Sequence, residues 1–354
     1  MSLTIPLVPS DTVWLTRGPF PTGTAIGLAN GWFEQAFASH GFKVSTLQES
    51  REPAMRAQHF YHDIKTLIRE GGNVLPLWTR ARNLGTKGWD NTVIVGLTWL
   101  DEVQVLLARP GSGVRSGDLA TLRGKRLGLS HAEGEIDVWR AMQLRGFATA
   151  LSLAGLGFDD VVLKDVVAPP VQWQNQNRTG VTGSHATELA LLNQEVDVIY
   201  VKGAAAIRLQ QEHGLEVVLD INSLDDPALR INNGTPRPIT VHRHFLDDHP
   251  DLVIAHLRVL NAAAGWARTH GDDLAGVLAA DIGATADSVR RGYGPRLSAG
   301  FDVNLNATRV DALQAQADFL AQHRLIDGHV TVREWIDTAP LLAAFADPLV
   351  VNAA

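Results

Sequence analysis

The chain has 354 residues, of which 45% are hydrophobic and 19% charged, and its formal net charge is −7. This length exceeds what one simple core holds, so two lobes are expected, and the ordinary composition excludes disordered and fibrous proteins. The acidic balance without a basic run excludes nucleic acid as a partner, and no apolar run approaches the roughly 20 residues of a membrane span.

The first six residues, MSLTIP, contain neither a basic segment nor an apolar stretch of the kind found in signal peptides. No leader is therefore expected in the sequence as it stands. The location stays open between two cases. The protein is periplasmic if a leader once preceded this sequence, and cytoplasmic if none did.

Strands and helices alternate along the first third of the chain. Residues 64–69 suit either a helical face or a strand. We favour a strand because Gly71 and Gly72 precede a fresh helix start, where Pro76 is tolerated in the first turn. The expected strands are 13–16, 43–47, 64–69 and 92–97, and the expected helices are 25–38, 53–58 and 73–84.

A second block of the same kind follows residue 108. Residues 172–184 are polar and rich in Gln, Asn and Gly, which is typical of a loop. From residue 250 onward the chain is mainly helical. The expected strands are 126–130, 161–167, 196–201, 216–219 and 239–241, and the expected helices are 136–153, 187–193, 252–268, 272–279, 285–293 and 307–323.

This alternation predicts an α/β protein with parallel or mixed sheets and right-handed crossovers. We expect two lobes, the first made of residues 1–108 and 237–354 and the second of residues 109–236. Ligands of such folds bind beyond the carboxyl ends of the strands. The loops expected to form the cleft between the lobes are 18–24, 70–73, 130–134 and 201–203.

The segment 58–72 gathers His59, His62, Arg69 and a glycine pair before a helix start. A helix N-terminus offers free N–H donors, and arginine adds a planar fork for a carboxylate, sulfonate or sulfinate. The alternatives are a surface salt bridge for Arg69 and a packed ring for His59. His59 and His62 are spaced as metal ligands can be, but no third ligand is placed to complete a site. No metal and no cofactor is expected.

Side chains beside the expected cleft loops complete the candidate ligand site. Lys202 would add positive charge to the cleft. The alternative is a solvated lysine at the end of a strand. Thr22 would bond an anion, or cap the helix that follows it. The aromatic candidates for an apolar wall, which would otherwise be core residues, are Phe20, Phe60, Trp139 and Phe147. The remaining candidates are Gly18, Pro19, Gly71, Gly72, Ser130, His131 and Gly203.

Two segments resemble signatures of the type II periplasmic substrate-binding proteins. Residues 119–129, LATLRGKRLGL, are similar to the family's DLKGKKIGV, and residues 193–200, NQEVDVIY, to its GEVDA turn and strand. The likeness is to the branch that binds nitrate, sulfonates, taurine and thiamine precursors. It implies the two-lobed type II fold, with a ligand cleft that closes by hinge motion.

Residues 59–77 resemble a narrower group built on the same scaffold, the 2'-hydroxybiphenyl-2-sulfinate desulfinases. Further likeness lies at 96–98, 139–140, 156–160, 266–268 and 292–294. The resemblance implies a catalytic cysteine, histidine and arginine supported by glycine N–H groups. The histidine and arginine fall on His59 and Arg69. The cysteine falls near Gly18, and the chain contains no cysteine at all, so the expected nucleophile is lost.

These features predict a solute-binding protein for a small organic anion, such as an aromatic or alkyl sulfonate. It would feed an ABC importer through the permease of that importer, and we expect a monomer that does not itself span a membrane. The competing interpretation is an enzyme, a desulfinase-like C–S hydrolase of an aromatic sulfinate. In that case His59 and Arg69 would act with water or a threonine in place of the thiol.

Overall fold

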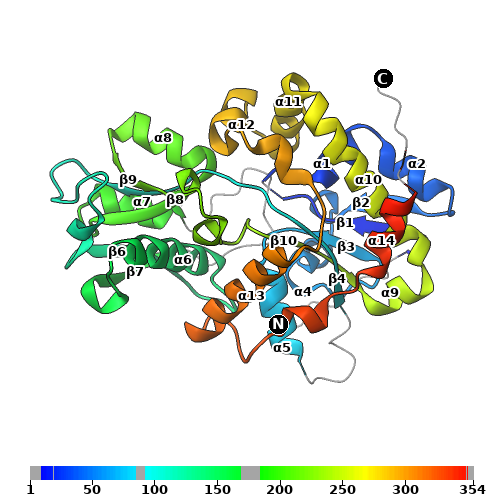
Figure 1. The fold of residues 1–354 in the computed structure, drawn as a ribbon, viewed down its shortest axis with the longest axis horizontal. Helices are drawn as coiled ribbons and strands as arrows, with labels where there is room; N and C mark the ends of the chain where they lie inside the picture. Colours follow the sequence, from blue (N-terminus) through cyan, green and yellow to red (C-terminus); the bar gives the residue numbers. More distant parts are fainter. Residues whose placement is uncertain (1–8, 19, 85–91, 169–183, 348, 350–354) are drawn as a thin grey trace.

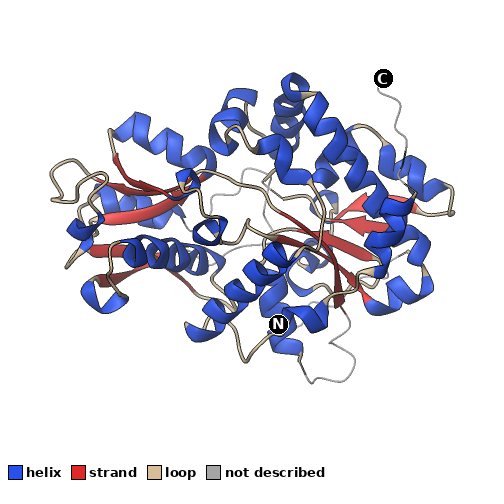
Figure 2. Cartoon of the chain, in the orientation of Figure 1, coloured by secondary structure: helices blue, strands red, loops and turns tan. Residues whose placement is uncertain are grey.

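The computed structural model describes residues 9–18, 20–84, 92–168, 184–347 and 349. Two lobes lie side by side, each built on one five-stranded sheet flanked by helices (Figures 1 and 2). The helices α12 and α13 lie between the lobes in this view (Figure 1). The expected α/β class with two lobes is confirmed.

The first sheet has the strand order β2-β1-β3-β10-β4, with β1 (Thr12–Leu15), β2 (Lys43–Thr46), β3 (Leu67–Glu70), β4 (Thr92–Thr98) and β10 (Arg237–His242). The second has the order β7-β6-β8-β5-β9, with β5 (Gln104–Ala108), β6 (Arg126–Ala132), β7 (Val162–Ala168), β8 (Val198–Lys202) and β9 (Glu216–Asp220). Both sheets are mixed, because β10 runs antiparallel to β3 and β4, and β5 antiparallel to β8 and β9.

Helices of the first lobe come from both ends of the chain. The N-terminal ones are α1 (Gly23–Ala29), α2 (Trp32–Ala38), α3 (Pro53–Arg56), α4 (Gln58–Tyr61) and α5 (Val74–Asn83). The C-terminal ones are α9 (Arg243–Asp248), α10 (Pro250–Thr269), α11 (Gly271–Ile282), α12 (Ala286–Tyr293), α13 (Ala307–Gln322) and α14 (Ala339–Ala346). The second lobe contains α6 (Val138–Leu153), α7 (Ser184–Leu192) and α8 (Gly203–His213).

The structure corrects several predicted boundaries. The helix expected over 25–38 is two helices, because Gly31 adopts a left-handed φ of 68° between them. Strand β5, which the predicted boundary at 109 leaves in the first lobe, pairs with β8 and β9 in the second sheet. The strand chosen over a helix near 64–69 is present as β3. Most of the loop predicted over 172–184 lies outside the described residues.

The two lobes share part of their hydrophobic core. Leu97 of the first sheet, Leu127 of the second and Leu313 of α13 belong to one buried cluster. A separate cluster fills the first lobe between its sheet and α10. Within the described residues, no helix is both long and apolar enough to cross a bilayer.

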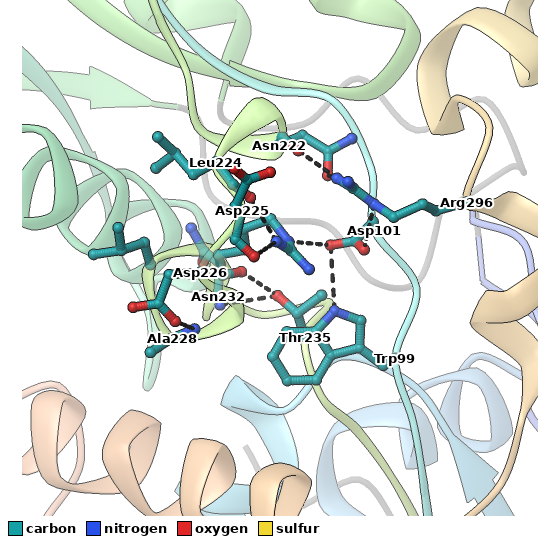
Figure 3. Close-up of polar contacts among 12 residues, drawn as sticks. Trp99, Asp101, Asn222, Leu224, Asp225, Asp226, Ala228, Asn232, Thr235 and Arg296 are labelled. Atoms are coloured by element: carbon teal, nitrogen blue, oxygen red, sulfur yellow. Dashed lines mark hydrogen bonds and ion pairs between the residues drawn. The ribbon is translucent and has the colours of Figure 1, made fainter.

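Two crossing segments join the lobes, and a buried carboxylate ties them together. Asp101, on the first segment, is 5% exposed and accepts hydrogen bonds from Trp99 Nε1 (3.2 Å) and from Arg230 Nε (3.0 Å) on the second segment. Arg296 Nε lies 3.0 Å from the other Asp101 oxygen, and Arg296 Nη2 donates to Asn222 Oδ1 at 2.9 Å. Figure 3 shows this network, which ties the two crossing segments to each other and to Arg296.

Candidate ligand-binding site

Arg69 on β3 is the centre of the candidate site. Its side chain is 1% exposed, and its buried Nε and Nη2 have no hydrogen-bond partner among the described residues. Desolvation lowers the pKa of Arg69 to about 9, so the guanidinium stays charged at neutral pH. A buried charge without a partner is costly. An anion bound here would neutralise the charge and accept from its free donors.

His59 on α4 stands beside this guanidinium. The residue is partly exposed, yet its Nδ1 is buried and has no partner among the described groups. Desolvation, helped by the charge of Arg69, lowers the pKa of His59 to about 3. The imidazole is therefore neutral at pH 7 and can donate or accept a hydrogen bond, but it does not hold the extra proton of an imidazolium acid. Buried Phe60 packs edge-on against it, with ring centroids 5.3 Å apart.

The two glycines after β3 have different roles. A Cβ on Gly71 would lie 3.5 Å from His59 Cε1 and 3.9 Å from Phe20 Cζ, so a side chain at this position would contact both rings. A Cβ on Gly72 would lie 2.4 Å from the Asn233 amide, whose Oδ1 accepts from the Val74 N–H at the start of α5 (2.9 Å). Part of the expected anion-binding helix end is thus capped by Asn233. Gly71 is the glycine that faces the rings of the site.

Phe20 fills the space where a side chain at position 18 would lie. A Cβ on Gly18 would stand 2.3 Å from Phe20 Cζ, which no real contact allows. The guanidinium of Arg237 also packs against the Phe20 ring, with its Cζ 4.3 Å from the ring centroid. Pro19, another candidate, lies outside the described residues. Thr22 accepts a hydrogen bond from the Ala25 N–H at 3.0 Å. Its hydroxyl oxygen therefore caps α1, which is the second of the two roles predicted for it.

Three buried charged residues were not singled out as candidates in the sequence. Arg237 is 2% exposed and donates from Nη1 to Pro21 O at 2.8 Å. Glu70 is 2% exposed and accepts from Thr24 Oγ1 at 2.7 Å, and its burial raises its pKa. Glu102 pairs with Lys202 at 2.8 Å. A charged residue inside an apolar strand was the available signal for Glu70 on β3 and for Arg237 on β10.

The candidates from the second lobe are mostly engaged within that lobe. Ser130 donates from Oγ to Asp137 at 3.0 Å, and its N–H donates to Gln143 Oε1 at 2.6 Å. His131 is exposed at the end of β6. Phe147 is fully buried in the shared hydrophobic core, which corrects its assignment to the cleft wall.

Lys202 and its neighbours lie where β8 ends. Lys202 Nζ lies 6.0 Å from the Trp139 ring centroid and is neutralised by Glu102, so it adds less positive charge than expected. The Gly203 N–H donates to Val103 O at 2.7 Å, and the φ of 62° at Gly203 favours glycine. These contacts leave Trp139 as the aromatic candidate of the second lobe that is not fully buried.

His62 has a structural role and is not placed as a metal ligand. Its Nε2 lies 3.1 Å from Leu67 O and its Nδ1 3.3 Å from Thr240 Oγ1, so both nitrogens have partners. Burial lowers its pKa well below the usual value. Within the described ranges, no group of three histidine or acidic side chains is placed to hold a metal ion.

Comparison with known proteins finds similarity over most of the chain. No protein-family model matches the chain. It is 24% identical over 353 residues to a 2'-hydroxybiphenyl-2-sulfinate desulfinase of Rhodococcus erythropolis, covering 92% of this chain and 91% of that protein.

Solved structures show the same fold. A cysteine-to-serine variant of the desulfurization enzyme DszB, in complex with biphenyl-2-sulfinic acid, has a TM-score of 0.73 at 22% identity, covering 96% of this chain and 99% of that chain. The periplasmic aliphatic sulphonate-binding protein SsuA of Escherichia coli has a TM-score of 0.64 at 16% identity, covering 98% and 95%. The chain thus contains no cysteine, has the type II periplasmic-binding-protein fold, and is similar to a desulfinase and to sulfonate-binding proteins.

Proposed function

We propose that the protein binds a small organic anion, with aromatic or alkyl sulfonates as the favoured class. The observation that carries the proposal is the buried, charged guanidinium of Arg69, whose Nε and Nη2 have no partner among the described residues. The neutral ring of His59 and the bare backbone of Gly71 stand beside it. A sulfonate presents three acceptor oxygens to such a set, and one charge-assisted hydrogen bond contributes roughly 1.5–3 kcal/mol.

Binding without turnover is the simplest account of position 18. The chain has no cysteine, and the Phe20 ring stands against Gly18 where a thiol would have to lie. The fold is shared with sulfonate-binding proteins. In this proposal the protein releases its anion to the permease of an ABC importer and acts as a monomer.

The second candidate function is a desulfinase-like hydrolysis of an aromatic sulfinate. The observation that favours it is the likeness to a desulfinase over 92% of the chain, together with the adjacency of His59 and Arg69. Without a thiol, water would have to attack the sulfur, so that an S–O bond forms, the C–S bond breaks, the carbon takes up a proton and sulfite leaves. The depressed pKa of His59 weakens it as a proton donor at neutral pH.

A thermal-shift screen tests the binding proposal. The panel contains alkyl sulfonates, benzenesulfonate, biphenyl-2-sulfinate, carboxylates of matched size and nitrate. We expect the melting temperature to rise in a saturable way with sulfonates and sulfinates, and less with carboxylates. A rise with nitrate alone would show that sulfonates are the wrong ligand class. No rise with any anion would overturn the proposal.

A further inference from the structure

His62 joins the short helix α4 to β3, which carries Arg69, and to the neighbouring strand β10. It directly follows the last residue of α4, and its N–H donates to Gln58 O at 3.0 Å, which closes that helix. The φ of His62 is 55°, a left-handed conformation that residues other than glycine rarely adopt. Such a conformation costs free energy, so other contacts of the residue have to compensate for it.

The two nitrogens of the His62 ring bond to different strands. Nε2 lies 3.1 Å from Leu67 O on β3, and because a carbonyl oxygen only accepts, this nitrogen carries the proton. Burial keeps the ring neutral by lowering its pKa, so Nδ1 accepts from the Thr240 hydroxyl on β10 at 3.3 Å. The His62 carbonyl accepts a further hydrogen bond from His242 Nε2 at 2.5 Å. The end of α4 is thus tied to β3 once and to β10 twice.

These ties lie next to both residues of the proposed anion site. Thr240 is the direct partner of Arg69 in the pairing of β10 with β3, so their side chains project from the same face of the sheet. The charge of Arg69 also acts on the rings of His59 and His62 and helps to lower both pKa values. His62 therefore holds α4 against the face of the sheet that carries Arg69.

His59 and His62 differ in what orients their rings. Both nitrogens of His62 have protein partners, so neither is left for a ligand. His59 lies three residues earlier, within one turn of α4, and its Nδ1 is buried without a partner among the described residues. Its ring packs edge-on against Phe60, the next residue of the same helix. The position of the His59 ring thus follows the position of α4.

We propose that His62, beyond its structural role, is a positioning residue of the anion site. By tying the end of α4 to β3 and β10, it holds the ring of His59 beside Arg69. The inference rests on the proposed function, in which His59 and Arg69 receive the anion. Without the His62 ring, the end of α4 is released, and an anion keeps its contact with Arg69 but loses the contact with His59.

Titration calorimetry with benzenesulfonate on a set of variants tests this inference. His62→Gly removes the ring without adding backbone strain, because glycine readily adopts a left-handed φ. His62→Asn also tolerates this φ and keeps an amide that can replace one of the contacts. Thr240→Val removes only the hydroxyl that bonds Nδ1 of His62. Each variant is made with and without His59→Ala.

His256→Ala is the matched control for lost stability. His256 is a fully buried, neutral histidine of the same lobe, but it lies on α10 and stacks on Phe33. We expect this variant to melt at a lower temperature and to bind benzenesulfonate as wild type does, because a folded protein with an intact site keeps its affinity.

We expect His62→Gly to weaken benzenesulfonate binding about fivefold or more, which corresponds to one lost hydrogen bond to the ligand. Thr240→Val and His62→Asn should each cause a smaller loss. In the His59→Ala background, the same three changes should alter the affinity by less than about twofold, because the contact that they misplace is already gone. This dependence on His59 separates positioning from a role in stability alone.

Two results would overturn the inference. One is unchanged affinity in His62→Gly or, if that variant does not fold, in Thr240→Val. The other is an equal loss with and without the His59 ring, which would show that His62 does not act through His59. Either result leaves the proposed function intact as long as wild type binds benzenesulfonate and Arg69→Gln weakens that binding. Failure of wild type to bind any sulfonate would overturn the proposed function and the inference together.

Discussion

At the scale of single residues, Arg69 determines whether the site holds an anion. We expect Arg69→Gln to weaken sulfonate binding at least tenfold, because it removes a charge-assisted contact of roughly 1.5–3 kcal/mol and 1.4 kcal/mol corresponds to a factor of ten. Titration calorimetry measures this loss. The matched control is Arg80→Gln, since Arg80 is a partly buried arginine against Trp335 in the last turn of α5. If Arg69→Gln bound sulfonates with unchanged affinity, Arg69 would not be a ligand-binding residue and its role would be structural.

Gly18 and Phe20 form the second feature at this scale. Gly18→Cys places a side chain within 2.3 Å of the Phe20 ring, so we expect a loss of about 1–3 kcal/mol in the free energy of unfolding. Adding Phe20→Ala to Gly18→Cys removes this overlap and should restore part of the loss. Urea denaturation measures both effects. Gly265→Cys is the control, because a Cβ there meets nothing within 4 Å. A fully stable Gly18→Cys protein would contradict the placement of Phe20.

At the scale of elements, the two glycines that precede α5 have different roles. Gly72 leaves room for the Asn233 side chain at the helix start, and Gly71 faces the rings of the candidate site. Gly72→Ala displaces Asn233 from the Val74 N–H, and the loss of such a cap costs roughly 0.5–2 kcal/mol. Gly71→Ala makes only ordinary contacts in the structure, so we expect nearly normal stability but several-fold weaker anion binding. Melting temperature and titration calorimetry on both variants distinguish the two roles. Equal loss of stability in the two variants would contradict this division.

The elements were predictable where the local pattern was strong. Strand β3 and helix α10 follow from apolar spacing and from the residues that bound them. Helix α8 was missed because its buried face is narrow, with Ala206 and Leu209 as its innermost residues. The helix predicted over 25–38 was wrong at Gly31, where a left-handed turn separates α1 from α2.

The candidate site was predictable only in part, for a physical reason. His59, Arg69 and Gly71 lie close in sequence, so their grouping could be inferred from the chain. Arg237 is brought near Glu70 by the pairing of β10 with β3, although the two residues lie far apart along the chain. The contact between Phe20 and Arg237 is likewise a product of tertiary packing, which no local pattern encodes.

At the scale of the whole molecule, buried neutral histidines make stability depend on pH. His256 on α10 is fully buried, stacks on Phe33 and has no partner for either ring nitrogen among the described residues; desolvation lowers its pKa to about 3. Between pH 6.5 and about 3, the unfolded chain binds a proton at this residue that the folded chain does not. Stability therefore falls as the pH falls through this window.

The variant His256→Leu isolates this contribution. We expect the loss of unfolding free energy between pH 7 and pH 5 to be about 2 kcal/mol smaller in His256→Leu than in wild type. Urea denaturation at the two pH values measures it. His131→Leu, at an exposed histidine, is the control and should leave the difference unchanged. An identical pH dependence in His256→Leu and wild type would contradict the buried neutral state of His256.

The central claim is that the site holds an anion and does not transform it. The most direct measurement follows biphenyl-2-sulfinate with the purified protein, recording bound ligand by calorimetry and free sulfite by a colorimetric assay in the same sample. We expect saturable binding by wild type, weakened at least tenfold in Arg69→Gln, and no sulfite above the protein-free control. Sulfite released in proportion to protein concentration, and abolished by His59→Ala, would contradict the account and identify the protein as an enzyme.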